Sequence, residues 1–319
     1  MSGDRIRGAF IGLAAGDAAG WPASRHRTAL HAPWSRRLYR ELDAFAEEHR
    51  VTTLPVPFAL NQPPLGIGPS DDAEWLAWTA LGLGGSRTEA FLALAGREDL
   101  RARISVATAL DNLAKGVEPP ASGHDNPHFF DDAAAVRAVA FGVLGWDPTD
   151  DAQVTNSGDG VLGAQAMAAA IAEAVATGSA AKAVEAALAA LPEDTAIGHN
   201  ARLAVGLVGK NDAFSVVPAL DAALLDHVYS YAVGAAQTVP VALALTLAGR
   251  GRIGSAVPAA VCLAPLADSA PALAGALTGA CGGYEAVPEG WTASARTLAG
   301  CCLPELAGRD LMEIVEGIA

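Results

Sequence analysis

The chain is poor in aromatic residues, which limits the kinds of core it can build. Aromatic side chains make up 6% of its 319 residues, against a hydrophobic share of 51% supplied mainly by Ala, Leu and Val. Small and aliphatic side chains suit the close packing of helices better than the packing of sheets. No stretch alternates steadily between apolar and polar residues, so the composition predicts an all-α protein.

Positive charge is also scarce. The chain has 21 Lys and Arg against 35 Asp and Glu, and its formal net charge is −14. Binding to a nucleic-acid backbone needs clustered Lys and Arg, so this balance argues against nucleic acid as a partner. The charge by itself carries no information about the fold.

Cysteine is rare, and its spacing excludes two common uses. Cys262 and Cys281 lie in apolar runs, and Cys301 and Cys302 are adjacent without a CxxC spacing. We therefore expect neither a disulfide framework nor a structural zinc site. The first residues lack the charged-then-apolar order of a secretory signal, so the sequence predicts a cytoplasmic protein.

One apolar stretch raises the question of a membrane. Val228–Gly249 reaches the length of about 20 residues that can span a bilayer. It contains Gln237, Pro240 and several small residues, which favour a buried helix of a soluble protein. We expect no membrane partner.

Helical patterns recur along the chain and are separated by short Gly, Pro and Asp turns. No helical period holds between Ser24 and Pro64, where prolines are frequent. No low-complexity linker divides the chain, so we expect a single domain over residues 1–319. The expected helices are Arg5–Ala19, Asp72–Leu83, Arg87–Leu94, Ile104–Lys115, Ala133–Val143, Gly160–Ala176, Ala180–Leu191, Gly198–Val208, Leu224–Leu247, Ile253–Cys262, Pro271–Cys281 and Thr292–Cys301.

Carboxylates stand at the start of two of these helices. Asp268 is the only charged residue within Ile253–Tyr284, and it comes just before the helix that begins near Pro271. Asp71 and Asp72 stand at the start of another helix far upstream. Capping and interaction with the helix dipole can explain such positions, at about 0.5 to 2 kcal/mol for a cap. If the two helix starts face one another, these three residues form an acidic pocket and are candidate catalytic carboxylates.

Four segments in order resemble the ADP-ribosylglycohydrolase family. They are the opening Arg5–Ala9 with Gly16–Pro22, the Ser-Asp-Asp motif at 70–72, the loop 116–123 with Ala135–Arg137, and the closing Asp268–Ser269 with Ala274–Leu277 and Gly283–Trp291. The resemblance spans most of the chain. It implies a single-domain orthogonal helical bundle whose cleft holds two divalent cations, usually Mg²⁺ or Mn²⁺. In that family the cleft hydrolyses the N- or O-glycosidic bond of an ADP-ribosyl group.

The resemblance also implies which oxygens would hold a metal. By family position these are Ser70, Asp71, Asp72, Asp268 and Ser269, and such hard oxygen ligands suit magnesium. Three positions depart from the family pattern. The first Asp of the closing motif is Leu266, the Thr after the Asp pair is Ala73, and the Glu after the opening Gly-x-Pro is Ser24. We therefore expect at most one ion, and a metal-free site is the alternative.

The central loop differs from the family in charge. Where the family has a Gly-rich turn, this chain has Asp131 and Asp132. Like charges about 4 Å apart cost roughly 1 kcal/mol in water and about 4 kcal/mol at an effective dielectric of about 20. We therefore expect a neutral or cationic ligand rather than a diphosphate, contacted by Trp21, Ser24, Asp131, Asp132 and His128.

Two histidines and three aspartates make His124–Asp132 the densest group of potential ligands, which a transition metal could use. A solvated turn is the alternative, because Pro127 interrupts the segment. On its apolar helix, Arg137 is expected to pair with a buried carboxylate rather than to clamp substrate. Asp17 is expected to tie the first helix into the core.

Two functional hypotheses follow. The first is a divergent glycosyl hydrolase that acts on a small N-ribosyl compound with a degraded metal site. The second is a non-catalytic relative that binds a nucleoside-like ligand or a protein partner. A repurposed enzyme should keep a closed polar pocket with perturbed carboxylates, whereas a binder could fill that pocket with side chains such as Leu266 and Phe130. The sequence does not indicate the oligomeric state.

Overall fold

A computed structural model describes residues 2–20, 68–225 and 233–318, and it confirms the all-α class. Within these ranges there is no β-strand, only isolated bridges between Asp131 and Gly234 and between Thr297 and Asp310. The helices are α1 (Ser2–Gly20), α5 (Asp71–Leu81), α6 (Arg87–Leu92), α7 (Ile104–Ala114), α8 (Ala121–His124), α9 (Ala133–Gly142), α10 (Thr149–Thr155), α11 (Asp159–Thr177), α12 (Ala180–Ala190), α13 (Ala196–Val208), α14 (Val217–Leu224), α15 (Ala235–Ala248), α16 (Ile253–Val261), α17 (Ala270–Gly282), α18 (Glu289–Ala295) and α19 (Leu311–Glu316), with short 3-10 turns η1 (Ala264–Leu266), η2 (Tyr284–Ala286) and η3 (Pro304–Leu306). The expected irregular region between Ser24 and Pro64 lies outside the described residues.

The centre of the molecule is an antiparallel pair of helices in backbone contact. A glycine recurs every fourth residue of α1, at positions 8, 12, 16 and 20, so one face of this helix carries no side chains. A Cβ atom at Gly12 would lie 2.2 Å from the carbonyl oxygen of Gly275 in α17, and one at Gly8 would lie 2.2 Å from that of Gly279. This close approach fixes the end of α1 that carries Asp17 beside the start of α17.

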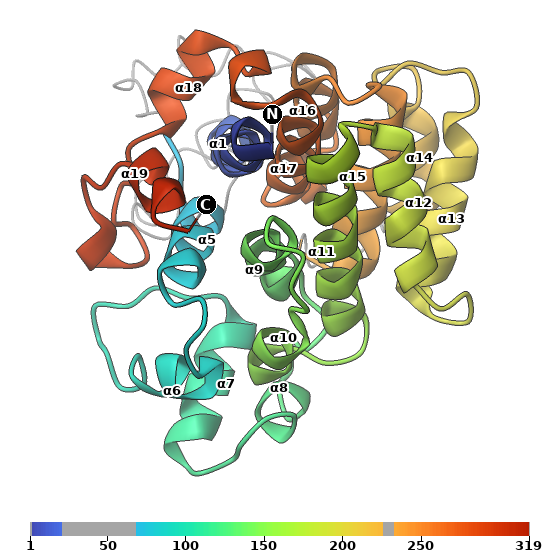
Figure 1. Cartoon of the computed structure of the whole chain (residues 1–319). Coiled ribbons are helices and arrows are strands. Elements are labelled where there is room, and N and C mark those ends of the chain that lie inside the picture. Colours follow the sequence, from blue (N-terminus) through green and yellow to red (C-terminus); the bar gives the residue numbers. More distant parts are fainter. Residues whose placement is uncertain (1, 21–67, 226–232, 319) are drawn as a thin grey trace, which may run out of the picture.

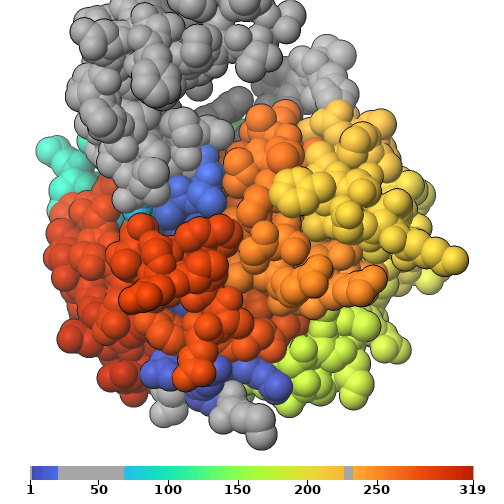
Figure 2. Space-filling model, turned by 90° about the horizontal axis from the view of Figure 1, so that it is seen from above, coloured from blue at the N-terminus to red at the C-terminus, as the bar shows by residue number. Residues whose placement is uncertain are grey.

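Helices from several parts of the chain cover this pair. Figure 1 views α1 nearly along its axis and α15 from the side, so the two helices cross at a steep angle. Helices α11, α15 and α16 pack on α17, while α5 packs against both α1 and α9. On the face shown in Figure 2, blue atoms of α1 are visible beside the orange and red C-terminal segments. The residues of α1 from Phe10 to Ala15 are buried, so the first helix is a core element.

The long helix expected over Leu224–Leu247 is wrong. Helix α14 ends at Leu224, the backbone of Leu225 is extended, and α15 begins only after the extended residue Gly234. Within α15, Pro240 lacks the N–H that would bond to the carbonyl of Ala236. Asn200 Nδ2 donates to that carbonyl instead, at 2.7 Å, so the helix continues through the proline.

The expected helix Thr292–Cys301 is right only at its start. Helix α18 ends at Ala295, and the chain then pairs with the segment before α19. The N–H of Leu298 donates to the carbonyl of Arg309 at 3.0 Å. The short helices α8, α10, α14 and α19 were not expected from the sequence, because one or two turns leave too short a periodic pattern to recognise.

Among the described helices, α11 alone is long and apolar enough to cross a membrane, with 56% of the relevant window buried in the protein. It packs against α9, α12, α15 and α17, which is the environment of a core helix. Of the stretch Val228–Gly249, the described part forms α15, whose 14 residues are mostly buried.

Candidate functional site

The start of α5 is held by a side chain from α1. Asp17 Oδ2 accepts the backbone N–H of Ser70 at 2.5 Å and that of Ala73 at 3.2 Å, and the Ser70 hydroxyl donates to Asp17 Oδ1. Ser70 itself makes no side-chain cap to its own helix. A carboxylate that accepts the unpaired N–H groups of a helix start acts as its cap. Asp17 therefore ties α1 to α5, as the sequence predicted.

Three helix starts meet at one buried point, each with its own carboxylates. Asp71 and Asp72 open α5, Asp131 and Asp132 precede α9, and Asp268 and Ser269 precede α17. Helix N-termini carry partial positive charge, which favours carboxylates at these positions. Together with Asp17, these aspartates form the acidic cluster: Asp17, Asp71, Asp72, Asp131, Asp132 and Asp268, none more than 5% exposed. The helix starts at 71–72 and 268, considered from the sequence as a possible pocket, thus lie close together.

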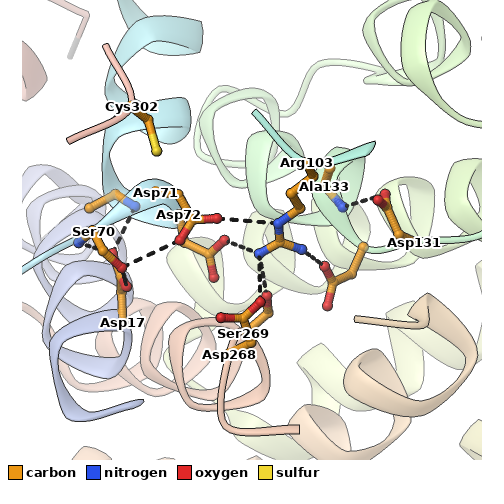
Figure 3. Close-up of polar contacts among 12 residues, drawn as sticks. Asp17, Ser70, Asp71, Asp72, Arg103, Asp131, Ala133, Asp268, Ser269 and Cys302 are labelled. Atoms are coloured by element: carbon orange, nitrogen blue, oxygen red, sulfur yellow. Dashed lines mark hydrogen bonds and ion pairs between the residues drawn. The ribbon is translucent and has the colours of Figure 1, made fainter. Parts of the chain in front are cut away.

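An arginine occupies the middle of the acidic cluster. Arg103 is the residue just before α7, to which its side chain makes no cap, and Figure 3 shows its guanidinium between carboxylates on both sides. Its Nε donates to Asp71 Oδ2 at 3.2 Å and its Nη2 to Asp72 Oδ1 at 2.6 Å. Its Nη1 pairs with Asp132 Oδ1. The guanidinium thus uses its rigid fork of donors to join α5 to α9.

The same guanidinium reaches the start of α17. Nη2 also donates to the Ser269 hydroxyl at 2.6 Å and lies 3.9 Å from Asp268 Oδ2. Arg103 is 6% exposed, so these contacts form away from water, where charge pairs interact more strongly. One cation therefore holds together helix starts that lie 29 to 166 residues away along the chain.

Burial and crowding shift the protonation of the acidic cluster. Burial, with the charge of Asp71 adding to it, raises the pKa of Asp17 to about 7 against the hydrogen bonds it accepts. Burial raises the pKa of Asp132 to about 7, although Arg103 opposes the shift. Burial likewise raises the pKa of Asp72 well above its usual range. One guanidinium does not balance six carboxyl groups, so part of the acidic cluster holds protons near neutral pH.

Little space is left beside the guanidinium. Within the described residues, Asp72, Trp75 and Arg103 with Val106, Ala133 and Val136 line a cavity of about 10 Å³. That is roughly the room needed by a single water molecule. Asp72 Oδ2 is buried there without a hydrogen-bond partner in this part of the chain. A sugar ring has no room in this cavity.

The residues expected to bind substrate do not form one set. Trp21 and Ser24 lie outside the described residues. Asp132 joins the acidic cluster through Arg103, and this pairing weakens the repulsion expected there for an anionic ligand. Asp131 Oδ1 accepts from Asn156 Nδ2 at 2.8 Å and from the N–H of Ala133 at 3.2 Å, so it braces the start of α9.

The rest of the loop His124–Asp132 is mostly a surface turn. His124 and Asp125 contact each other at 3.1 Å, with side chains 74% and 68% exposed. His128 is half-buried, and its ring lies 5.6 Å from that of Phe130. The two histidines are thus not drawn together with Asp131 and Asp132 into one ligand set, which agrees with the alternative of a solvated turn.

Of the five residues expected to hold a metal, four converge, but around a guanidinium. Four of these residues, Asp71, Asp72, Asp268 and Ser269, contact Arg103, and Ser70 donates to Asp17 instead. Leu266, at the position of the missing ligand, is fully buried among apolar residues. Magnesium requires an octahedral set of oxygens at about 2.0 to 2.1 Å, usually including water. With the guanidinium in place, these residues do not fit a divalent ion.

A second group of side chains of the kinds that bind metals lies at the end of the first turn of α5, and hydrogen bonds to the backbone explain why they are close together. Atoms of Glu74, Cys301 and Cys302 lie within 4.8 Å of one another. Both Glu74 oxygens accept backbone N–H groups, from Cys301 and Cys302 at 2.7 Å each and from Leu303 at 3.0 Å. Contact with Cys301 and burial raise the pKa of the Cys302 thiol, which disfavours a metal-binding thiolate.

The structure confirms that Arg137 pairs with a buried carboxylate, as the sequence indicated. It is fully buried, and its Nε donates to Asp151 Oδ2 at 2.8 Å while Arg87 Nε donates to Asp151 Oδ1 at 2.8 Å. Its Nη2 donates to the Thr155 hydroxyl at 2.7 Å. Two arginines therefore share one buried carboxylate, apart from the acidic cluster.

Sequence reasoning missed Arg103, the residue that defines the acidic cluster. It stands in the charged segment 97–103, which has the composition of an ordinary solvated loop. One usable signal was that the sequence predicted more buried carboxylates than one metal ion would bind. Buried carboxylates need a compensating positive charge, so a buried cation was to be expected. Nothing local distinguishes Arg103 from the exposed Arg101 two residues earlier.

Comparison with known proteins agrees with this architecture. The model of the ADP-ribosylglycohydrolase family matches residues 2–318. Among solved structures the chain resembles an "ADP-ribosylglycohydrolase-related protein complex", with a TM-score of 0.59 and 20% identity over 99% of this chain and 98% of that one. At this identity the likeness supports the fold alone. No curated protein matches the chain.

Proposed function

This chain belongs to the ADP-ribosylglycohydrolase family, and from that premise we propose that it is a non-hydrolytic member that binds a nucleoside-like ligand. The observation that carries the proposal is the guanidinium of Arg103, which fills the acidic cluster and leaves about 10 Å³ beside it. A glycosyl hydrolase needs its carboxylates within hydrogen-bond reach of the bond that breaks. These carboxylates are instead bonded to Arg103 and to backbone N–H groups.

A separate hollow, lined in part by Arg101 and Ala102 just before Arg103 in the chain, offers the space that the acidic cluster lacks. It has a volume of about 490 Å³, within the range of about 300 to 1,000 Å³ of small-molecule sites. Leu94, Leu100 and Leu110 give it apolar walls, and Arg97, Arg101 and Asp111 supply charged groups of both signs. The apolar walls suit the face of a base, and the charged groups suit hydrogen bonds to its edge and to sugar hydroxyls. We assign the ligand to this hollow.

The test combines turnover with binding. The purified protein is incubated with ADP-ribosyl-arginine, ADP-ribosyl-serine and a purine nucleoside, with Mg²⁺ or Mn²⁺, and released ADP-ribose or ribose is followed by chromatography. An active member of the family serves as the positive control. We expect no release above that of the buffer, and saturable calorimetric binding of ADP-ribose or the nucleoside. Arg101→Ala and Asp111→Ala should weaken the binding, whereas Arg250→Ala, beside a separate hollow, should not.

One observation favours a second candidate, a metal-independent hydrolase of a small N-ribosyl compound. A pKa of about 7 for Asp132 suits general acid–base work near neutral pH. Release of ribose in the presence of a chelator, abolished by Asp132→Asn, would support this candidate and refute the non-hydrolytic one. Release that depends on Mg²⁺ would refute both.

A further inference from the structure

We propose that the guanidinium of Arg103 is a built-in replacement for divalent cations, and that removing it uncovers a divalent-cation site made by Asp71, Asp72, Asp268 and Ser269. The proposal concerns the acidic cluster only. It goes beyond the proposed function and does not depend on which ligand, if any, the hollow lined by Arg101 binds.

The first support is the set of atoms that faces the guanidinium. Carboxylate oxygens of Asp71 and Asp72 and the hydroxyl of Ser269 lie 2.6 to 3.2 Å from its nitrogens, and Asp268 Oδ2 lies 3.9 Å away. Carboxylate and hydroxyl oxygens are hard ligands, which Mg²⁺ and Mn²⁺ prefer. The donor set therefore suits a divalent ion, whereas the occupied centre does not.

The second support is an oxygen that the guanidinium leaves unused. Asp72 Oδ2 is buried and has no hydrogen-bond partner among the described residues, beside the small cavity that Arg103 also lines. A buried oxygen without a partner normally costs about 1 to 3 kcal/mol. A divalent ion in the place of the guanidinium can be coordinated by both oxygens of Asp72. The guanidinium bonds to Oδ1 alone.

The third support is the way Arg103 enters the acidic cluster. Its backbone is fixed independently of its side chain, because its carbonyl accepts the N–H of Ala107 at 2.9 Å and Arg101 N–H donates to the carbonyl of Cys302 at 3.0 Å. Truncation of the side chain therefore removes a cation without releasing the backbone around residue 103, while Asp17 still holds the start of α5 and Asp131 that of α9. The carboxylates then lack a counterion, and a small divalent ion with water can supply the charge.

The experiment measures metal binding in four chelator-treated proteins. They are the wild type, Arg103→Ala, Arg103→Ala with Asp268→Ala, and Arg137→Ala as the control for loss of a different buried arginine. Mn²⁺ and Mg²⁺ are titrated by calorimetry, and thermal unfolding is followed with and without the ion. We expect an apparent Kd for Mn²⁺ at least tenfold lower in Arg103→Ala than in the wild type, and loss of that gain in the double variant. Arg137→Ala should behave as the wild type.

Two results would overturn the proposal. The first is tight Mn²⁺ binding by the wild type that Asp268→Ala abolishes, because the guanidinium would then coexist with the ion. The second is an Arg103→Ala protein that gains no affinity for Mn²⁺, whether it is folded or stays unfolded with the ion present. Folding of Arg103→Ala only when Mn²⁺ is added would support the proposal, since the ion would then replace the guanidinium. None of these outcomes involves hydrolysis or nucleoside binding.

Discussion

The contact between α1 and α17 gives the sharpest test of how this molecule is built. Replacing Gly12 by Ala adds one methyl group at a point where no side-chain movement can make room. The new Cβ would lie 2.2 Å from the carbonyl oxygen of Gly275 and 3.2 Å from the Cα of Gly279. An ordinary contact starts at 3.4 Å, so the two helices must part by about 1.2 Å at this point.

The expected cost follows from that displacement. Overpacking a core costs about 1 to 3 kcal/mol, and a gap of 0.5 to 1 Å already removes a quarter to a half of a dispersion contact. The helix preference of Ala over Gly returns at most about 1 kcal/mol. The clash is with backbone, and parting the helices at Gly12 also loosens the equally close contacts at Gly8 and Gly16, so we expect a net loss of about 2 kcal/mol.

Gly206 provides a matched control within the same protein. It lies in α13, and a Cβ atom there would meet nothing within 4 Å. Gly206→Ala should therefore raise the free energy of unfolding by up to about 1 kcal/mol. Urea unfolding followed by circular dichroism compares both variants with the wild type. A Gly12→Ala protein as stable as the wild type, with the expected gain at Gly206, would refute the backbone contact.

Three further substitutions probe the buried charges. Asp17 has a pKa of about 7 in the folded protein against 3.8 when unfolded, so its contribution to stability is full below about pH 4 and is lost as the pH rises to about 7. Relative to the wild type, Asp17→Asn should therefore gain unfolding free energy on the order of a few kcal/mol between pH 4 and 7, measured by urea titrations across that range, and a constant difference would contradict the reasoning. Asp151→Ala leaves Arg87 and Arg137 buried without their shared carboxylate, and it should destabilise the protein by about 3 to 5 kcal/mol in the same assay, whereas a loss below about 1 kcal/mol would argue against the shared pair. Glu74→Gln replaces an acceptor of three backbone N–H groups, so hydrogen exchange should quicken at 301–303 and stay unchanged in α13; equal protection in both proteins would show that Glu74 does not hold this segment.

Local pattern sufficed for most of the helices and failed where contacts decide the ends. The apolar periods of α9, α11 and α17 identified these helices to within a few residues. The break between α14 and α15 was missed, although Asp226, His227 and Ser230 interrupt the apolar run there. Likewise, α18 ends early because residues after it pair with the segment at 309–311, which no local period encodes.

In the candidate site, too, some features were predictable from the sequence and others depend on contacts between distant segments. The sequence by itself determined the all-α class, the helix starts that carry Asp71, Asp72 and Asp268, and the paired state of Arg137. Helix signals are local, since they depend on residues three or four apart, and so they can be read from the chain. The tertiary structure alone decided which cation balances the acidic cluster. Arg103 meets Asp72 across 31 residues and Ser269 across 166, and only the packing of α5, α9 and α17 brings these partners within hydrogen-bond distance.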